Sequence, residues 1–485
     1  MDKISRRKFL EKSLLINGSV VLGSAWICPF LESFTLPQAI LYHVQIQDDN
    51  PAIAWSQDKC KGCRDCLTAC AEKQLIQGSY KSVRGHHVCI HCGACIQVCP
   101  YGALTEKYNY REVFSALEDP SKIVIASIAP SVPAGIGEFF GLPSGSYLDG
   151  NIAGACKTLG FDYVLNNNFS ADLTIMEEAH ELQRRMEGNS ALPQFTSCCP
   201  AWVKYVEMYY PSLVKHLSTT RSPFSMQGAL VKSYFARKKK IDPARIVHVA
   251  IAPCTAKKYE IGREELTTDG LRSTDIEITT NELAMMLREK NIHIAGQKGA
   301  FDSSMGKASG SGIIFGNSGG VMRAALRTAH YNLTGKNPAG DFLELKELQG
   351  LTGLKEATVK IGDRSLNVAV VYEMRNAKPI LEQVMAGTCK YDFVEVMACQ
   401  GGCIGGAGQP AKTISDLENR MKALDSADAG AAFRFSHENP EIRTIYRKFL
   451  GKPGGKDAER LLHTYYTDKS ELLVPAKSRK PAKVS

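Results

Sequence analysis

The sequence has no stripe of basic residues with aromatic side chains between them, and its aromatic content is only 8%. The net charge over 485 residues is +9; residues 1–40 carry +2 and residues 470–485 carry +3, which leaves +4 for everything between. Because a nucleic-acid-binding surface concentrates basic residues, nucleic acid is not expected as a partner. With 44% hydrophobic and 22% charged residues, the composition is that of a globular protein.

An uninterrupted apolar run long enough for a good membrane span is also missing at the N-terminus. The apolar stretch 14–31 contains Asn, Ser and two glycines, which suits the core of a signal segment better than a span. It follows Ser5-Arg6-Arg7-Lys8-Phe9-Leu10, a twin-arginine signature. Residues 1–31 are therefore predicted to be a signal for the twin-arginine translocase, with an ordinary amphipathic helix as the alternative. No clean A-x-A cleavage site follows, so an uncleaved anchor stays open, and residues 32–55 are predicted to be a linker.

Cysteine, in contrast, is abundant. Of the 16 cysteines, thirteen fall into tight clusters, which favours metal ligation over the disulfides expected in an exported protein. Cys28, Cys156 and Cys389 are left over, and the last two are predicted to be small buried hydrophobic residues.

Residues 60–99 carry the strongest local pattern: Cys60-x2-Cys63-x2-Cys66-x3-Cys70, then Cys89-x2-Cys92-x2-Cys95-x3-Cys99-Pro100. This spacing is similar to that of bacterial two-cluster ferredoxins, in which the fourth cysteine of each run binds the other cluster. The resemblance implies one [4Fe–4S] cluster on Cys60, Cys63, Cys66 and Cys99, and another on Cys89, Cys92, Cys95 and Cys70. A zinc ribbon is the alternative, but a third and a fourth cysteine at fixed offsets disfavour it. Ala71 departs from the pattern, since proline often stands there.

From Lys122 onward, strand-like apolar runs alternate with helix-like segments, which is typical of α/β architecture. The predicted strands are 122–129, 161–165, 194–197, 245–252, 277–280, 312–315, 357–361, 366–372 and 392–396; the predicted helices include 171–186, 282–290 and one starting at Val321. We expect two α/β lobes with a site between them. The fold class is α/β, or α+β overall.

The domains predicted are a two-[4Fe–4S] ferredoxin-like domain at 56–110 and a two-lobed catalytic domain at 120–410. A helical segment follows at 411–468, and the basic tail at 469–485 is predicted to be disordered.

Three further cysteine loops each follow a strand-like run and precede a helix-like one, where α/β folds place their sites. They are Thr196-Ser197-Cys198-Cys199-Pro200, Pro253-Cys254-Thr255 and Cys399-Gln400-Gly401-Gly402-Cys403. In the third loop the glycines allow the backbone to curl closely around a ligand, and thiolates are metal ligands. Two apolar cysteines buried in a Gly-rich turn are the alternative for that loop alone. Four cysteines on three loops suit a cubane cluster.

With all three loops in this order, the sequence resembles iron-only ([FeFe]) hydrogenases from about Cys60 to about Tyr465. Residues 411–468 resemble the small-subunit segment of this family, fused here at the C-terminus. The resemblance implies an H-cluster, that is, a [4Fe–4S] cubane bridged to a diiron subcluster carrying CO, CN and a dithiolate. The implied ligands are Cys199, Cys254, Cys399 and Cys403, with Cys403 as the bridge. Lys257 and Ser131 match residues that contact the two cyanides, and Met397 matches a methionine packed near the diiron unit.

The resemblance also implies a proton relay that runs through Cys198, Glu178, Ser218 and Glu181 and ends at Arg185 on the surface. Cys198 and Cys199 are adjacent, so in an extended backbone one sulfur can bind metal while the other exchanges protons. Glu178 and Glu181 share one face of a predicted helix. An ordinary solvated glutamate pair is the alternative.

Four residues depart from the family pattern and put contacts around the cofactor in doubt: Ala201, Phe224, Ala252 and Gln400. A separate motif, Gly316-Asn317-Ser318-Gly319-Gly320, matches a nucleophile elbow, but no Asp and His follow in a triad context. A serine hydrolase is therefore not expected, and these glycines are predicted to allow close backbone approach near the site.

The predicted function is the reversible conversion of H2 to protons and electrons by an exported oxidoreductase, matured by hydrogenase maturases. The alternative is a non-catalytic hydrogen sensor or iron–sulfur assembly protein. Residues 51–110 hold seven Lys/Arg against four Asp/Glu, which favours an acidic ferredoxin as electron carrier. A location in the periplasm or on the outer face of the cytoplasmic membrane favours a c-type cytochrome and H2 uptake. We weigh location above a charge of this size, because exposed charges are screened beyond about 8–10 Å.

Overall fold

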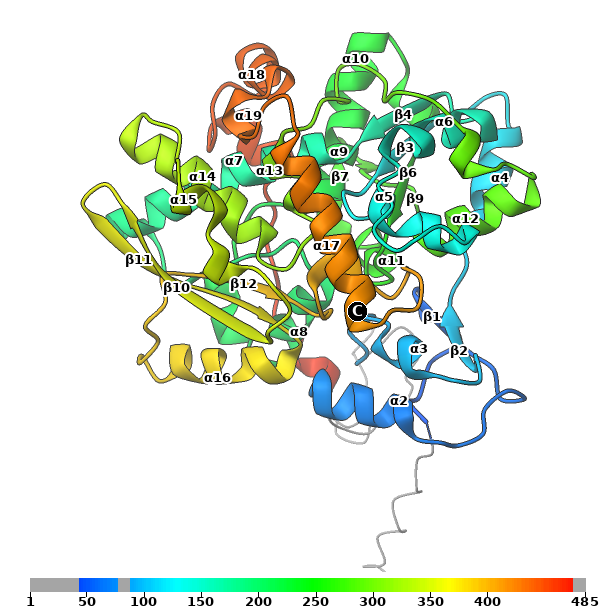
Figure 1. Cartoon of the computed structure of the whole chain (residues 1–485), viewed down its shortest axis with the longest axis horizontal. Helices are drawn as coiled ribbons and strands as arrows, with labels where there is room; N and C mark the ends of the chain where they lie inside the picture. Colours follow the sequence, from blue (N-terminus) through cyan, green and yellow to red (C-terminus); the bar gives the residue numbers. More distant parts are fainter. Residues whose placement is uncertain (1–42, 77–87, 474–485) are drawn as a thin grey trace, which may run out of the picture. The chain divides into compact units, whose positions relative to one another are not determined.

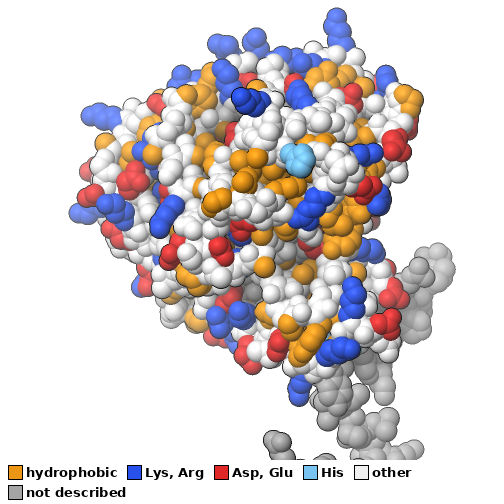
Figure 2. Space-filling view, turned by 45° about the vertical axis from the view of Figure 1, so that its right-hand side comes forward, with side chains coloured by type: hydrophobic (Ala, Val, Ile, Leu, Met, Phe, Trp, Pro, Cys, Tyr) orange, Lys and Arg blue, Asp and Glu red, His pale blue; other side chains and the backbone are white. Residues whose placement is uncertain are grey.

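The computed structural model describes residues 43–76 and 88–473. The predicted signal segment 1–31 and most of the basic tail lie outside the described residues, as does Cys28. Within residues 43–76 and 88–473, none of the helices has the length and apolar character needed to cross a membrane. On the face drawn in Figure 2, Lys and Arg side chains are spread among Asp and Glu.

The first lobe is a parallel four-stranded sheet in the order β4-β3-β6-β9 (Figure 1). Its strands are β3 (Ile123–Ile128), β4 (Tyr163–Asn166), β6 (Ile246–Ala252) and β9 (Ile276–Thr279). The helices of this part of the chain are α4 (Tyr110–Glu118), α5 (Val132–Gly135), α6 (Asp149–Leu159), α9 (Pro223–Leu230), α10 (Ala236–Lys239), α11 (Lys257–Glu260) and α12 (Thr280–Glu289). Near-continuous apolar strands suit a parallel sheet buried on both faces. Cys156 is fully buried in the core of this lobe, as predicted.

The second lobe is a mixed sheet in the order β10-β11-β12-β5. β10 (Leu354–Ile361) and β11 (Arg364–Tyr372) form the predicted hairpin, whose turn places Gly362 at φ 60°. β12 (Phe393–Met397) and β5 (Gln194–Phe195) continue the sheet in parallel. The other helices here are α8 (Pro200–Tyr209), α14 (Gly320–Thr334), α15 (Asp341–Glu344) and α16 (Met374–Met385). A small hairpin, β7 (Thr267–Thr268) with β8 (Leu271–Arg272), lies outside both sheets.

One predicted strand is wrong: residues 312–315 fall at the end of helix α13 (Gly310–Ile314). Ser309 caps this helix, since its side chain accepts a hydrogen bond from the Gly312 N–H. A short apolar run cannot be assigned to strand or helix by its pattern alone, and here the cap decides. Gly312 sits against the backbone of α7 (Asn168–Arg184), where a Cβ would lie 2.9 Å from Asp172 Oδ1.

The ferredoxin-like region is built on α2 (Asp65–Thr68), a π-helical turn at Ala69–Lys73 and α3 (Ala94–Val98). A two-stranded sheet joins its ends, because β1 (Ile53–Trp55) pairs antiparallel with β2 (Leu104–Glu106). The predicted linker 32–55 is therefore wrong at its C-terminal end. Ile53 is buried and packs with Leu104 in the core of this region.

The C-terminal segment is helical, as predicted, with α17 (Ile414–Ala429), α18 (Pro440–Ile445) and α19 (Lys456–Leu462). Asp172 of α7 fastens it to the catalytic region: the buried carboxylate accepts hydrogen bonds from Ser436 Oγ and Asn439 Nδ2, both 2.8 Å long. The tail was predicted to be disordered from residue 469. Its first residues are ordered instead: Ser470–Leu473 forms a 3₁₀ turn, and Lys469 pairs with buried Glu207 at 2.7 Å.

Candidate active site

The three cysteine loops meet at one cavity between the two sheets. β5 and β12 of the second lobe deliver the first and third loops, and β6 of the first lobe delivers the second. The side chains expected at the cofactor all line this cavity: Ser131, Cys198, Cys199, Cys254, Lys257, Met397, Cys399 and Cys403. This cavity lies where the sequence predicted the site, between the two lobes.

Close backbone packing holds the third loop in place. Gly401 and Gly402 have φ values of 79° and 78°, in the left-handed region that glycine adopts readily. A Cβ on Gly402 would lie 2.7 Å from the Ser318 amide nitrogen, so the loop lies directly on the Gly316–Gly320 turn. The predicted role of that turn is supported, and Ser318 itself accepts a hydrogen bond from Lys355 Nζ at 3.1 Å.

Two polar groups in the cavity wall suit an anionic group. Ser131 is fully buried, and its hydroxyl has no hydrogen-bond partner within the described residues. Lys257 is not a surface lysine: its ammonium donates to the Cys198 carbonyl at 3.1 Å and pairs with Glu260 at 2.7 Å. Burial lowers the pKa of Lys257, but the charge and hydrogen bond of Glu260 and the charges of Cys254 and Cys198 together outweigh burial and raise it. A fixed cation and an unsatisfied hydroxyl therefore face the cavity.

The four cysteines of the three loops offer sulfur ligands for iron. Burial raises the pKa of Cys403 to about 12 and that of Cys399 to about 11, so both would stay protonated at neutral pH without a metal. Iron stabilises the thiolate form. Four soft sulfur ligands beside a cation and a free hydroxyl fit the H-cluster that the loops predict.

The ferredoxin-like cysteines separate into the two predicted sets. Cys60, Cys63, Cys66 and Cys99 line one small cavity together. Cys92 is surrounded by the other set, because the charges of Cys70, Cys89 and Cys95 each raise its pKa after burial. Within the described residues, no group of three or more His, Cys, Asp or Glu side chains is placed so that it could hold a single metal ion. The individual ligand assignments stay predictions.

A contact joins the inner ferredoxin-like set to the catalytic cavity. Thr255, next to Cys254, donates its hydroxyl to the His91 carbonyl at 2.7 Å, and His91 stands next to Cys92 in the chain. Lys204 Nζ donates to the Cys89 carbonyl at 2.8 Å. Neither Thr255 nor Lys204 could be found from the sequence pattern, because their partners lie more than a hundred residues away.

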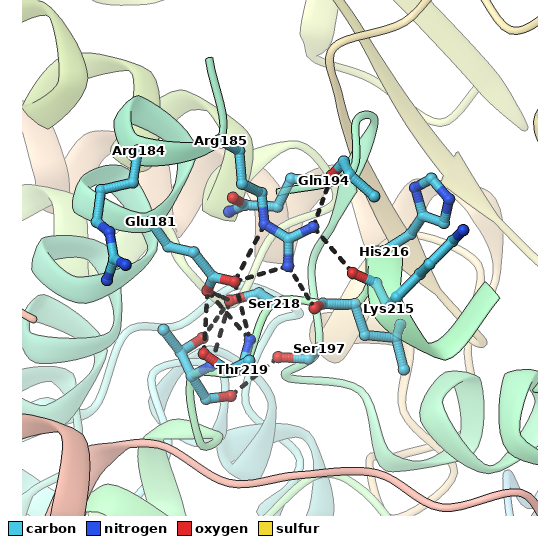
Figure 3. A network of polar contacts seen from close by, with 12 residues as sticks. Glu181, Arg184, Arg185, Gln194, Ser197, Lys215, His216, Ser218 and Thr219 are labelled. Atoms are coloured by element: carbon cyan, nitrogen blue, oxygen red, sulfur yellow. Dashed lines mark hydrogen bonds and ion pairs between the residues drawn. The ribbon is translucent and has the colours of Figure 1, made fainter. Parts of the chain in front are cut away.

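Beyond the cavity, the outer residues of the predicted relay, Ser218, Glu181 and Arg185, lie together (Figure 3). Ser218 Oγ donates to Glu181 Oε2 at 2.7 Å, and Arg185 pairs with Glu181 Oε1 at 2.7 Å. Glu178 is buried, and burial followed by the charge of Glu181 raises its pKa well above the usual range. A protonated carboxyl can donate a proton, which a relay requires. Burial and then the charge of Glu178 raise the pKa of Cys198, so these two groups interact. The alternative of a solvated glutamate pair is wrong.

Arg185 is not at the surface, contrary to the prediction. Its side chain is 3% exposed. The guanidinium donates to the carbonyls of Ala191, Lys215 and Leu217 at 2.7–3.1 Å as well as to Glu181 (Figure 3). A planar donor fork satisfied by three carbonyls and a carboxylate is held in one position. The sequence around Arg185 could not reveal its burial, because the Lys215 and Leu217 carbonyls that it binds belong to another segment of the chain.

The four departures from the family pattern lie in different places. Phe224 and Ala252 line the catalytic cavity. Gln400 lines a separate cavity next to the ferredoxin-like region, and Ala201 is buried on α8. Only the first two can therefore change the shape of the cofactor cavity directly.

A family model described as "Iron only hydrogenase large subunit, C-terminal domain" matches residues 122–407. Models described as "Iron hydrogenase small subunit" and "4Fe-4S dicluster domain" match residues 414–469 and 52–107. The chain belongs to the iron-only hydrogenase family. As in this family, the cofactors are two [4Fe–4S] clusters and an H-cluster, and the small-subunit segment is fused to the same chain.

Similar proteins include hydrogenases from several organisms. The chain is 40% identical to the "NADP-reducing hydrogenase subunit HndD" of Solidesulfovibrio fructosivorans, covering 88% of this chain and 76% of that one. It is 44% identical to the "Periplasmic [Fe] hydrogenase large subunit" of Nitratidesulfovibrio vulgaris, covering 66% and 84%. A solved [FeFe]-hydrogenase of Chlamydomonas reinhardtii superposes with a TM-score of 0.66 at 37% identity, covering 74% of this chain and 99% of that one.

The similarity also reaches proteins with other names. The chain is 30% identical to the bovine "Cytosolic iron-sulfur assembly component 3", covering 78% of this hydrogenase-family chain and 82% of the bovine one. Family membership alone therefore leaves two functions to compare.

Proposed function

We propose that this protein interconverts H2 with protons and electrons, and that electrons pass through its two [4Fe–4S] clusters to an external carrier. The observation that carries the proposal is the hydrogen-bonded set Ser218, Glu181 and Arg185, together with buried Glu178, whose charge acts on Cys198 in the wall of the cofactor cavity. A scaffold for cluster assembly needs cysteine ligands but has no use for a buried chain of proton-exchanging groups.

The residues that would hold the H-cluster are Cys199, Cys254, Cys399 and Cys403, with Cys403 as the bridge. When bound, the cluster supplies the redox-active metal site at which the H–H bond is made or broken. Lys257 and Ser131 would bind its anionic ligands, and Met397 would pack against it. The apolar wall formed by Phe224, Pro223 and Ala252 keeps bulk water out.

Protons would pass between the cluster and solvent through the side chains. Cys198 faces the cavity, Glu178 lies next to it, and the Ser218 hydroxyl reaches Glu181. A hydroxyl can accept one proton while it donates another, so Ser218 can connect the two carboxyl groups. Arg185 would hold Glu181 in place through its two hydrogen bonds to Oε1.

Electrons would leave by way of the Thr255–His91 contact to the inner cluster, then by the outer cluster, where Cys63 is exposed. A c-type cytochrome is the proposed carrier, with ferredoxin as the alternative. Export by the twin-arginine translocase and maturation by hydrogenase maturases are part of the proposal. The similarity to a relative named periplasmic supports export, whereas the similarity to an NADP-reducing subunit does not.

The proposed function is tested by maturing the full chain with the diiron cluster and measuring H2 evolution from a reduced viologen dye. We expect turnover by the matured protein and none by protein that holds only [4Fe–4S] clusters. The carrier is tested separately, by the reduction of a c-type cytochrome and of an acidic ferredoxin under H2 over a salt series. Faster reduction of ferredoxin that slows steeply with salt would replace the cytochrome in the proposal. Absence of H2 turnover from protein with a complete H-cluster would favour the assembly function.

A further inference from the structure

The relay has no evident outer end in Arg185, because that guanidinium is buried and fully engaged. Glu181 must exchange its proton with another group. Besides Ser218 and Arg185, the side chain that approaches the Glu181 carboxylate is Thr219, whose backbone N–H donates to Oε2 at 3.0 Å and whose hydroxyl lies 3.5 Å from Oε2. Thr219 is exposed to solvent.

The Thr219 hydroxyl leads to a histidine of the C-terminal segment. His463 Nδ1 lies 2.8 Å from Thr219 Oγ1. The backbone fixes this contact, since Thr220 and His463 form an antiparallel bridge and the Thr464 N–H donates to the Thr219 carbonyl at 2.8 Å. Backbone hydrogen bonds therefore hold the imidazole next to Thr219, in addition to the contacts of its own side chain.

The other ring nitrogen of His463, Nε2, contacts a carboxylate that is not itself one of the predicted relay groups. Glu177 is fully buried, lies on α7 next to Glu178, and contacts His463 Nε2 at 3.1 Å. Two groups also donate hydrogen bonds to this carboxylate: Tyr446 Oη, and the Gly454 N–H at 2.8 Å. An acceptor fixed in this way keeps a proton on Nε2 and leaves Nδ1 to exchange protons with Thr219.

We propose that His463 is the proton-exchange residue at the outer end of the relay, connecting Glu181 to solvent through the Thr219 hydroxyl. In the inward direction the Nδ1 proton of the imidazolium passes to Thr219 Oγ1, and the hydroxyl proton of Thr219 passes to Glu181. The imidazole is left neutral with its proton on Nε2, and water reprotonates Nδ1. The outward direction is the reverse. This inference rests on the proposed hydrogenase function.

The surroundings of His463 favour this role near neutral pH. Burial lowers its pKa, but the hydrogen bond and charge of Glu177 outweigh burial, so the pKa is raised above 6.5. The imidazolium is thus populated at and below neutral pH and is lost as the pH rises through the raised value. The His463 side chain is 8% exposed, and two of its neighbours reach solvent: Thr219 is exposed, and Glu459, 3.8 Å from Nδ1, has a side chain that is 45% exposed. The charged and titratable groups around the imidazole are Glu177, His180, Glu181 and Arg184 from α7, Tyr446, and Glu459 from α19.

The test compares His463→Gln with the parent and with His180→Gln, in matured full-length protein. Gln can bond to Thr219 and Glu177 but cannot titrate. His180 lies on α7, the helix that carries Glu177 and Glu181. In the described part of the chain, no hydrogen bond joins His180 to Thr219 or Glu181. We expect His463→Gln to keep the infrared bands of the bound cluster and to lose turnover roughly tenfold at neutral pH, less than the ~100-fold of a group at the reacting bond. The plot of turnover against pH for His463→Gln should lose the change in rate that comes from titration of His463. His180→Gln should match the parent.

Two further readouts separate proton exchange from a structural role. In His463→Ala, added imidazole should restore much of the lost rate, because a free base can replace the missing one. Independently of turnover, the His463 titration followed by NMR should shift to lower pH in Glu181→Gln, since the carboxylate charge that favours the imidazolium is removed. Parent-like turnover of His463→Gln across the pH range, or no rescue by imidazole, would overturn the inference. If the fully loaded parent itself does not turn over H2, the proposed function fails instead.

Discussion

The two proposed routes out of the catalytic cavity, one for electrons and one for protons, are built differently. Toward the ferredoxin-like region, one hydrogen bond from Thr255 to the His91 carbonyl joins two loops whose neighbouring cysteines are the expected ligands. Toward solvent, the route needs side chains of α7, of the loop after the first cysteine motif and of the C-terminal segment. Electrons need only short separations, whereas protons need an unbroken series of groups that can accept and donate. The proton route is therefore the one more easily broken at a single residue.

The largest effect is expected where both routes begin. Cys403→Ala should abolish H2 turnover and the infrared bands of the diiron unit, because the predicted bridge is the protein's one covalent bond to it. The four clustered cysteines of each ferredoxin-like set should still bind iron, so about eight Fe or more should remain. Cys389→Ala, a cysteine outside all clusters, is the control and should behave like the parent. Full activity of Cys403→Ala would show that the ligand assignment is wrong.

The next effect is on the proton route alone. Cys198→Ala should keep the cluster and its infrared bands but lose about 10²- to 10⁴-fold in turnover, because proton transfer by a positioned group is removed. Glu178→Gln should behave similarly, since an amide cannot pass a proton as a carboxyl does. For each variant, the infrared spectrum shows whether the cluster is kept, and the H2 turnover of the same sample shows whether proton transfer is lost. A variant that turns over H2 like the parent would remove Cys198 from the route.

The smallest effect is expected on the electron route. Thr255→Val keeps the side-chain shape but removes the hydroxyl that donates to the His91 carbonyl. A single hydrogen bond contributes only about 1 kcal/mol, so folding should persist. Electron delivery from H2 to an external acceptor should slow a few-fold, while H/D exchange, which needs no external carrier, should match the parent. Thr358→Val, on the exposed β10–β11 hairpin, is the control. Equal slowing of both reactions would mean that the contact affects the site and not the route.

The same difference explains what the sequence could predict. The ferredoxin-like cysteines are specified by local spacing, and their two sets come together as predicted. The three catalytic loops were found because each stands at the end of a strand-like run. The burial of Arg185 and the place of His463 could not be predicted, because they depend on groups elsewhere in the chain: the Lys215 and Leu217 carbonyls for Arg185, and Thr219 for His463. The misassigned strand at 312–315 has a related cause, since only its cap and its packing on α7 identify it as a helix.

The central claim is that the cavity between the two sheets holds a complete H-cluster in this particular chain. Infrared spectroscopy of the matured, full-length protein tests it most directly, because the stretches of metal-bound CO and CN have no other source in the molecule. We predict these bands together with about fourteen Fe per chain, from three cubanes and a diiron unit. Protein with only about twelve Fe and no such bands after maturation would contradict the account and leave a cluster-binding protein without a hydrogen-activating site.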